Sequence, residues 1–203
     1  MKRNLITSLS AIVVFTVLLG VAYPLVITGL GQVAFSKNAD GNPDLIAKAW
    51  TKPALDAGGQ PTKDADGNEV TEPDPQYFQP RPSQTGYNAN GTYFSNRGPN
   101  QKSAEFFYRD QINAYLDLNG SHDPGLTAAK VPIDAVTTSG SGVDPHISQA
   151  NAAIQARRVA AVRNLPLEQV QAAVEDATDG RSFGVLGEPG VNTTKLNSAL
   201  DAR

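Results

Sequence analysis

An uninterrupted apolar segment near the N-terminus constrains this chain more than any other feature. No charged residue occurs from Asn4 to Ser36, and Leu9 to Leu30 consists mostly of Ile, Val, Leu, Phe and Ala. A helix of that length measures about 30 Å, the thickness of the hydrocarbon core of a bilayer. Backbone groups in lipid must be hydrogen-bonded within the segment, so a single isolated span has to be helical. We therefore predict a transmembrane helix over residues 9–32.

A cleaved signal peptide is the alternative explanation of this segment. The apolar region of a signal peptide normally covers about 7 to 15 residues and ends at a small-x-small cleavage site. Here the apolar run is longer, and it continues through Tyr23 and Pro24 without such a site. The sequence therefore favours a retained membrane anchor over a cleaved leader.

The charges that precede the segment indicate its orientation. Lys2 and Arg3 come before it, and the positive-inside tendency of membrane proteins keeps such residues in the cytoplasm. We expect a single-pass protein of the plasma membrane, with residues 1–8 cytoplasmic and residues 37–203 forming an extracytoplasmic domain. The lipid bilayer is the first partner that the sequence implies.

Small and weakly polar residues interrupt the apolar surface of the predicted span. Small side chains let helices approach closely in a membrane, where burial of apolar surface gives no drive for association. Gly and Pro are also commoner in spanning helices than in soluble ones, which is the alternative explanation. We favour docking against partner helices, through Thr16, Gly20, Tyr23, Pro24, Thr28 and Gly29.

The composition argues against several classes of function. Lys and Arg total 17 against 20 Asp and Glu, and the net charge of −3 is unlike the basic footprint of a nucleic-acid binder. The chain has no cysteine, which excludes disulfides, thiolate catalysis and Cys-based metal sites. Its two histidines, His122 and His146, leave little material for a zinc site. We expect neither a nucleic-acid partner nor a metal ion.

Residues 41–100 are predicted to be rich in loops, because eight prolines, seven glycines and six asparagines punctuate them. An acidic insertion at about residues 56–76 carries six carboxylates against Lys63 alone. Its Asp64-Ala-Asp-Gly-Asn68 run resembles part of a calcium loop, but the Gly and Glu that an EF-hand needs at its sixth and twelfth positions do not fall there. We predict a solvated acidic loop.

The remaining residues alternate between helical and short extended patterns. Ser103 is expected to cap the first helix and Gly120 to follow its end, and Gly180 is expected to close a helix that Pro166 opens. An apolar stripe of Leu167, Val170, Val174 and Ala177 marks the buried face of that second helix. We predict helices at about 103–119, from Pro145 or Ser148 to about 164, at 166–179 and at 193–200, and a strand at 133–138. The fold class is a single N-terminal transmembrane helix followed by one small α+β soluble domain.

The run from Ser139 to His146 is the most site-like segment of the domain, and its glycines allow three interpretations. A phosphate loop would need a terminal Lys-Ser or Lys-Thr, which is absent, although turn amides can bind an anion without it. A hydrolase elbow needs Gly-x-Ser-x-Gly, and residue 139 is Ser. In a purely structural turn, Asp144 caps a helix that Pro145 opens, and His146 is an ordinary first-turn residue. The structural turn is the interpretation that local composition favours.

Several longer motifs, in order along nearly the whole chain, are similar to those of one known family. Tyr77-Phe-Gln-Pro-Arg-Pro-Ser83, for example, matches the family's Tyr-Phe-x-x-Arg-Pro-Ser. The chain resembles the family of C subunits of the bacterial Kdp potassium-transporting ATPase. The matching segments are Tyr23–Gly29, Gln32–Phe35, Tyr77–Ser83, Ser95–Gln101, Val131–Asp134, Val136–Ser148, Gln155–Ala160, Gly187–Asn192 and Leu196–Asp201. The segment Pro43–Lys48 and the acidic insertion depart from the family pattern.

The resemblance implies an accessory, non-catalytic subunit of a complex that imports potassium at high affinity by hydrolysing ATP. Its implied partners are a channel-like potassium-translocating subunit, a P-type ATPase subunit and a small membrane subunit. The C subunit is described in the family as a catalytic chaperone that raises the ATP affinity of the pump. ATP is the only cofactor implied, and only by this resemblance. The candidate nucleotide-binding residues are Ser139, Gly140, Ser141, Gly142, Asp144, His146, Gln155 and Arg158.

The charge-derived orientation conflicts with direct nucleotide contact. If Lys2 and Arg3 stay inside, Ser139 to Gln155 lie outside, where cytoplasmic ATP does not reach. We favour the orientation, with the domain positioned over the extracellular mouth of the channel-like subunit and the acidic insertion raising the local potassium concentration. The alternatives from other classes are a membrane-tethered hydrolase using Ser141 and His146, and an outward-facing module that binds a small ligand.

Overall fold

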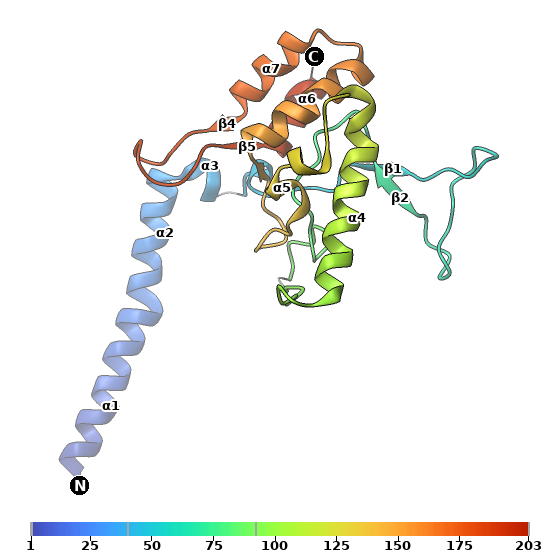
Figure 1. Cartoon of the computed structure of the whole chain (residues 1–203). Coiled ribbons are helices and arrows are strands. Elements are labelled where there is room, and N and C mark those ends of the chain that lie inside the picture. The colour runs from blue at the N-terminus through green and yellow to red at the C-terminus, as the bar shows by residue number, and fades with distance from the viewer. Residues whose placement is uncertain (1, 40, 92, 203) are drawn as a thin grey trace. The chain divides into compact units, whose positions relative to one another are not determined.

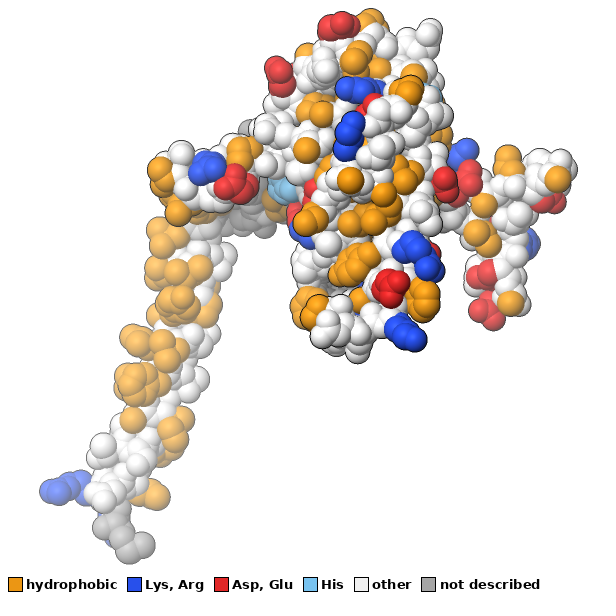
Figure 2. All heavy atoms as spheres, viewed as in Figure 1, with side chains coloured by type: hydrophobic (Ala, Val, Ile, Leu, Met, Phe, Trp, Pro, Cys, Tyr) orange, Lys and Arg blue, Asp and Glu red, His pale blue; other side chains and the backbone are white. Residues whose placement is uncertain are grey.

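The computed structural model describes residues 2–39, 41–91 and 93–202 and divides into two compact units, residues 1–43 and residues 44–203. The N-terminal unit is dominated by one long helix from Lys2 to Ala34, drawn in blue in Figure 1. None of its described residues is buried, and hydrophobic side chains follow it along its length (Figure 2). Its length and composition are those of a membrane span. The prediction of one N-terminal apolar helix is confirmed.

The long helix changes its hydrogen-bond pattern just before Pro24. It consists of α1 (Lys2–Val17), a π-helical turn η1 (Leu18–Ala22) and α2 (Tyr23–Ala34), and a short α3 (Ser36–Ala39) follows. In the π turn the N–H of Tyr23 donates to the carbonyl of Leu18, five residues earlier. Pro24 has no N–H to continue the α pattern, and a wider turn accommodates it without ending the helix.

The C-terminal unit combines helices with two small antiparallel sheets, as the α+β prediction requires (Figure 1). Its sheets are a two-stranded one, β1–β2, and a three-stranded one with the order β3–β5–β4. The helices are α4 (Lys102–Asn119), α5 (Ile133–Val136), α6 (Gln149–Arg163), α7 (Leu167–Asp176) and α8 (Thr193–Asp201), with short 3₁₀ turns at Pro43–Leu45, Gly120–His122 and Ala128–Lys130. The strands are β1 (Thr51–Pro53), β2 (Thr71–Pro73), β3 (His146–Ile147), β4 (Thr178–Asp179) and β5 (Gly190–Asn192).

The hydrophobic core lies where α6, α7 and α8 meet the central strand β5. Val159 of α6, Val170 of α7, Val191 of β5 and Leu196 of α8 are completely buried there, and so is Phe78 from the irregular segment before α4. Fully burying a side chain of this size contributes about 1.5–3 kcal/mol. The predicted stripe of α7 faces this core, since its other members are buried or packed against the cluster.

The acidic insertion forms a projecting two-stranded arm rather than an unpaired loop. Strands β1 and β2 pair antiparallel, with Lys52 opposite Glu72, and isolated bridges continue the pairing to Lys63 and Glu69. Nearly all side chains of the arm are exposed, and acidic groups are visible along it in Figure 2. The base of the arm is fixed to the domain by the side chain of Gln79, whose amide donates to the carbonyl of Trp50 at 2.9 Å.

The strand predicted at 133–138 is a single helical turn, α5. Its β-branched residues favoured an extended conformation, but a distant contact determines the local structure. The carboxylate of Asp134 accepts the N–H and the hydroxyl of Ser148, at 2.8 and 2.7 Å, and the side-chain amide of Asn151 at 3.0 Å. The helical turn places Asp134 against the start of α6. The local sequence around residue 134 does not contain Ser148 or Asn151 and therefore did not reveal this contact.

Three predicted helix boundaries were wrong. Helix α4 begins after Gln101 instead of at a Ser103 cap, and α7 ends four residues before Gly180. Asp144 does not cap α6, because the two residues of β3 separate it from the helix. The cap is Ser148, whose hydroxyl accepts an N–H from the first turn. In each case the predicted residue lies within a few positions of the observed boundary.

Candidate functional site

The loop from Ser139 to His146 uses its own backbone amides to hold its shape. The buried hydroxyl of Ser139 accepts the N–H groups of Gly142 and Asp144 at 3.0 and 3.3 Å. The hydroxyl of Ser141 accepts the N–H of Val143 at 3.2 Å. A phosphate loop needs such amides to point at its ligand. The N–H groups of residues 142, 143 and 144 instead donate to hydroxyls of the loop itself, so the arrangement is that of a structural turn. Gly140 of this turn is exposed to solvent.

Gly142 joins this loop to the segment that contains the Tyr77–Ser83 motif. Its carbonyl accepts the hydroxyls of Ser83 and Thr85, at 2.6 and 3.4 Å. Gly142 has φ of +77°, and a Cβ built there would lie 2.5 Å from the Thr85 hydroxyl oxygen. Both the backbone conformation and the close approach therefore require glycine at this position.

His146 lies in β3 between two carboxylates, and not in a helical first turn. Its Nε2 is 2.8 Å from Asp179 of β4, and its Nδ1 is 3.5 Å from Asp144. The hydrogen bond with Asp144 raises the pKa of His146 to about 8, burial opposes this shift, and Asp179 adds to it. A Ser–His–Asp triad needs one ring nitrogen to face the nucleophile. Here both face carboxylates, an arrangement suited to an ion pair.

Asp144 completes this charged cluster. Partial burial alone would raise its pKa, but the side-chain and backbone hydrogen bonds of His146, and the charges of His146 and Arg81, outweigh burial and lower that pKa. Arg81 Nη1 lies 3.5 Å from Asp144. The cluster thus ties the loop to the Tyr77–Ser83 motif on one side and to β4 on the other.

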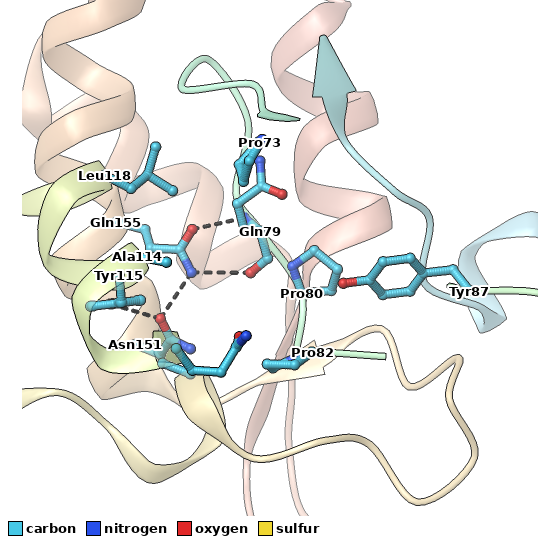
Figure 3. A pocket seen from close by; sticks show the side chains of 12 residues that line it. Pro73, Gln79, Pro80, Pro82, Tyr87, Ala114, Tyr115, Leu118, Asn151 and Gln155 are labelled. Atoms are coloured by element: carbon cyan, nitrogen blue, oxygen red, sulfur yellow. Dashed lines mark hydrogen bonds between the residues drawn. The ribbon is translucent and has the colours of Figure 1, made fainter. Parts of the chain in front are cut away.

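Gln155 of α6 lies away from this loop and binds the backbone of Gln79 (Figure 3). Its Oε1 accepts the N–H of Gln79 at 2.7 Å, and its Nε2 donates to the carbonyl of the same residue at 3.1 Å. Asn197 of α8 does the same for Phe78, with both distances 2.9 Å. We call these two buried side-chain amides, of Gln155 and Asn197, the amide clamp. They bond the backbone N–H and C=O groups of Phe78 and Gln79, as a neighbouring strand would in a sheet.

Arg158 is completely buried one turn after Gln155. Its Nε donates to Asn119 Oδ1 at 3.0 Å, and its Nη2 donates to the Tyr77 carbonyl at 3.1 Å and to Gln155 Oε1 at 2.9 Å. A further bond joins its Nη1 to the carbonyl of Pro75. Burial lowers the pKa of Arg158 to about 10, which still leaves it charged at neutral pH. All three guanidinium nitrogens are engaged within the domain.

A cavity of about 140 Å³ lies between α4 and the segment held by the clamp (Figure 3). Two of its polar groups already bond each other, since the Tyr115 hydroxyl donates to Asn151 Oδ1 at 2.9 Å. Pockets for drug-sized ligands measure about 300–1,000 Å³, so this cavity is smaller than a typical ligand site. Its lining consists of Pro73, Gln79, Pro80, Pro82, Tyr87, Gln111, Ala114, Tyr115, Leu118, Ala135, Asn151 and Gln155.

The structure therefore separates the candidate nucleotide residues into two groups. Residues 139–146 form the turn and the charged cluster, whereas Gln155 and Arg158 belong to the polar core. The nucleotide contact that the resemblance implies for them stays a prediction. Sequence reasoning missed three polar residues that these two groups contact: the half-buried Gln79 and Arg81 and the buried Asn197. The one available signal was that all three lie inside the matching motifs.

The candidate docking residues all lie exposed on the apolar helix. Thr16, Gly20, Pro24 and Thr28 are spaced four residues apart and thus neighbour one another along the helix surface. A Cβ at Gly20 would have Thr16 Cγ2 as its nearest neighbour, at 3.9 Å, and one at Gly29 would meet nothing within 4 Å. The helix itself does not require these glycines; their contact with a partner helix stays a prediction.

Known proteins match the chain over almost its whole length. Residues 5–202 match the family model described as KdpC: K+-transporting ATPase, c chain. The Potassium-transporting ATPase KdpC subunit of Methylococcus capsulatus is 44% identical over 198 residues, covering 96% of this chain and 95% of the relative. The subunits of the same name from Mycobacterium bovis and Rhodospirillum rubrum are 41% and 42% identical, covering 99% and 100% of this chain and 99% and 97% of the relatives. The chain therefore belongs to the KdpC family, the c chains of K+-transporting ATPases.

Proposed function

We propose that this chain is an accessory, non-catalytic subunit of an ATP-driven, high-affinity potassium import complex in the plasma membrane. The observation that carries the proposal is the family match over residues 5–202, together with relatives named as subunits of a potassium-transporting ATPase. The charged cluster and the amide clamp support a structural role for the domain, since their groups bond one another. The partners are a channel-like subunit, a P-type ATPase subunit and a small membrane subunit.

The membrane helix docks the chain to these partners. Its stripe of Thr16, Gly20, Pro24 and Thr28, with Tyr23 and Gly29 beside it, offers a close approach for another helix. The large apolar side chains elsewhere on the helix face lipid. Assembly in the membrane is thus the first task of the chain.

The C-terminal domain lies outside the cytoplasm, over the extracellular mouth of the channel-like subunit. Lys2 and Arg3 at the start of the helix support this orientation. The inward-pointing amides of the 139–146 loop support a domain that does not hold ATP. Its effect on the ATP affinity of the pump, as a catalytic chaperone, then acts through assembly and not through nucleotide contact.

Affinity purification tests the accessory role. The tagged full-length chain is recovered in mild detergent from potassium-limited cells, and co-purified proteins are identified and assayed for potassium-stimulated ATP hydrolysis. We expect stoichiometric recovery with a P-type ATPase and a channel-like protein. A monodisperse chain without these partners would overturn the proposal and favour a tethered enzyme or a ligand-binding module.

Two variants test docking in the same experiment. Gly20→Leu and Gly29→Leu place bulk where the isolated helix has room for it, so we expect loss of partners without loss of the inserted chain. Val14→Leu, two residues from Thr16 and therefore on the opposite side of the helix from it, is the matched control and should retain them. If all three variants recover the partner subunits equally, these glycines do not contribute to docking.

The orientation has its own test, which uses the absence of cysteine from the chain. A single Asp66→Cys substitution in the exposed arm is treated with a membrane-impermeant maleimide on intact cells. Labelling before lysis is the expected result. Labelling only after lysis would place the domain in the cytoplasm and reopen direct contact with ATP.

A further inference from the structure

The chain contains two Asn-Gly pairs, and the fold presents them in opposite ways. Asn90-Gly91 lies in the irregular segment between the Tyr77–Ser83 motif and α4, whereas Asn119-Gly120 stands at the end of α4. Such a pair can react with itself, because the backbone nitrogen of the glycine can attack the side-chain amide carbon of the asparagine. Glycine favours that approach, since it has no Cβ and the widest range of backbone angles.

Asn90 is exposed and lies in a turn. Its N–H donates to Asn88 Oδ1 at 2.9 Å, which holds the backbone of the turn. Among the residues that the structure describes, neither the side-chain amide of Asn90 nor the N–H of Gly91 has a hydrogen-bond partner. A Cβ built on Gly91 would meet nothing within 4 Å. Both reacting groups are therefore free to approach each other and to exchange protons with water.

Asn119 is only 1% exposed, and both ends of its side-chain amide are engaged. Its Oδ1 accepts the Nε–H of Arg158 at 3.0 Å, and its Nδ2 donates to the Tyr115 carbonyl at 2.9 Å. The N–H of Gly120 donates to the Leu116 carbonyl. The same reaction here requires the end of α4 to open first. Opening of a packed segment costs free energy, so only a small fraction of molecules is reactive at any time.

We propose that Asn90 is a site of spontaneous deamidation and that the fold protects Asn119 from the same reaction. The Gly91 nitrogen bonds to Cγ of Asn90, the bond from Cγ to the amide nitrogen breaks, and ammonia leaves with the proton of the Gly91 N–H. Water then opens the resulting succinimide ring at either carbonyl, which gives aspartate or isoaspartate at position 90. The net reaction consumes one water and releases one ammonia, and it needs no other reactant.

The product differs from the parent in charge and, for isoaspartate, in the length of its backbone. A carboxylate replaces a neutral amide, and the isoaspartyl form adds one methylene between positions 90 and 91. A chain that persists in the membrane therefore accumulates a more acidic form of this turn, at a rate set by residues 90 and 91. The inference is independent of the proposed transport role.

Peptide mapping of the aged protein tests the proposal. The full-length chain in detergent is incubated at mildly alkaline pH, digested with trypsin and analysed by mass spectrometry, which detects the exchange of an amide for a carboxyl group. Asn90 and Asn119 fall in different tryptic peptides, residues 64–97 and 110–130. We expect the deamidated fraction at Asn90 to exceed that at Asn119 by at least about tenfold. Comparable fractions at the two sites in the folded protein would overturn the proposal.

The same chain in denaturant is the matched control for the effect of the fold. Both Asn-Gly pairs are then exposed, so their rates of deamidation should converge, while the rate at Asn90 should change little. If the rate at Asn90 rises about tenfold or more on unfolding, the turn protects this residue and the proposal is wrong.

Gly91→Ala tests the ring-closing step. The φ of Gly91 lies outside the left-handed region and open space surrounds the residue, so alanine fits without strain. We expect the variant to keep the melting temperature of the parent and to deamidate at Asn90 about tenfold or more slowly, because the added Cβ hinders attack. Deamidation at the parental rate would indicate direct hydrolysis of the amide and would contradict the succinimide route.

Discussion

Gln155 binds the backbone of Gln79 through both atoms of its side-chain amide, at 2.7 and 3.1 Å, although 76 residues separate them. The side chain of Gln79 in turn donates to the carbonyls of Trp50 and Asp74, which form the base of the acidic arm. One helix therefore positions an extended segment, and that segment positions the arm. A glutamine within a family motif thus has a structural explanation that involves no ligand.

Replacing Gln155 with Ala should destabilise the domain by about 2–4 kcal/mol, because the partly buried N–H and C=O of Gln79 lose their partners. Thermal unfolding of the full-length chain in detergent, followed by the fluorescence of its single tryptophan, Trp50, measures this change. Gln171→Ala, at an exposed position of α7, is the control and should be nearly neutral. Unchanged stability combined with altered ATP affinity of the pump would instead favour a nucleotide role for Gln155.

Two consecutive arginines should respond very differently to substitution. Arg158→Met leaves several buried acceptors unpaired and should cost about 3–5 kcal/mol of unfolding free energy. Arg157→Ala removes an exposed pair with Asp123 and should cost no more than about 1 kcal/mol. Denaturant titration of both variants makes the comparison. Similar losses would contradict the buried network described for Arg158.

The glycines of the 139–146 loop should also differ. Gly142→Ala forces a Cβ against Thr85 at a positive φ and should destabilise by about 2 kcal/mol or more. Gly140→Ala meets nothing within 4 Å and should stay within about 0.5 kcal/mol of the parent. Thr85→Ala in the Gly142→Ala background should restore part of the loss. Tolerance of both alanines would mean that the loop is not fixed as described.

The charged cluster gives stability a defined pH dependence. The pKa of His146 is raised from 6.5 to about 8 on folding, so its contribution is complete below 6.5 and is lost as the pH rises through 8. The melting temperature should therefore fall between about pH 6 and pH 9. His146→Gln should flatten this fall, while His122→Gln, at the only other histidine, should preserve it. A fall that survives His146→Gln would assign the titration to another group.

The acidic arm offers an electrostatic test. A variant with Asp56→Asn, Asp64→Asn and Asp66→Asn loses three negative charges but keeps a side-chain oxygen at each position. In Asp56 and Asp64 such an oxygen accepts N–H groups of the turns. At about 10 mM salt the half-saturating potassium concentration of transport should rise, whereas at physiological salt, with a screening length of about 8 Å, the difference should disappear. If the half-saturating potassium concentration is the same in both proteins at low salt, the acidic arm does not contribute to potassium capture.

Periodicity and charge predicted what depends on local sequence. The charge-free run specified the N-terminal helix, and the stripe from Leu167 to Ala177 specified the buried face of α7. Asp134 was misread because its conformation follows from Ser148, which local propensity does not include. The burial of Arg158 was not predicted, because a charged residue in an alanine-rich helix normally faces water. Its burial depends on acceptors that come from loops far along the chain.

The π turn at Leu18–Ala22 sets the rotation of α1 about the helix axis relative to α2. An α-helix advances by about 100° per residue, so deleting one residue of this turn would rotate everything before it relative to α2. Thr16 would then leave the line of Gly20, Pro24 and Thr28, although no residue of that line had been changed. The one residue by which the π turn exceeds an α turn thus determines which side of α1 faces a partner helix that packs on α2.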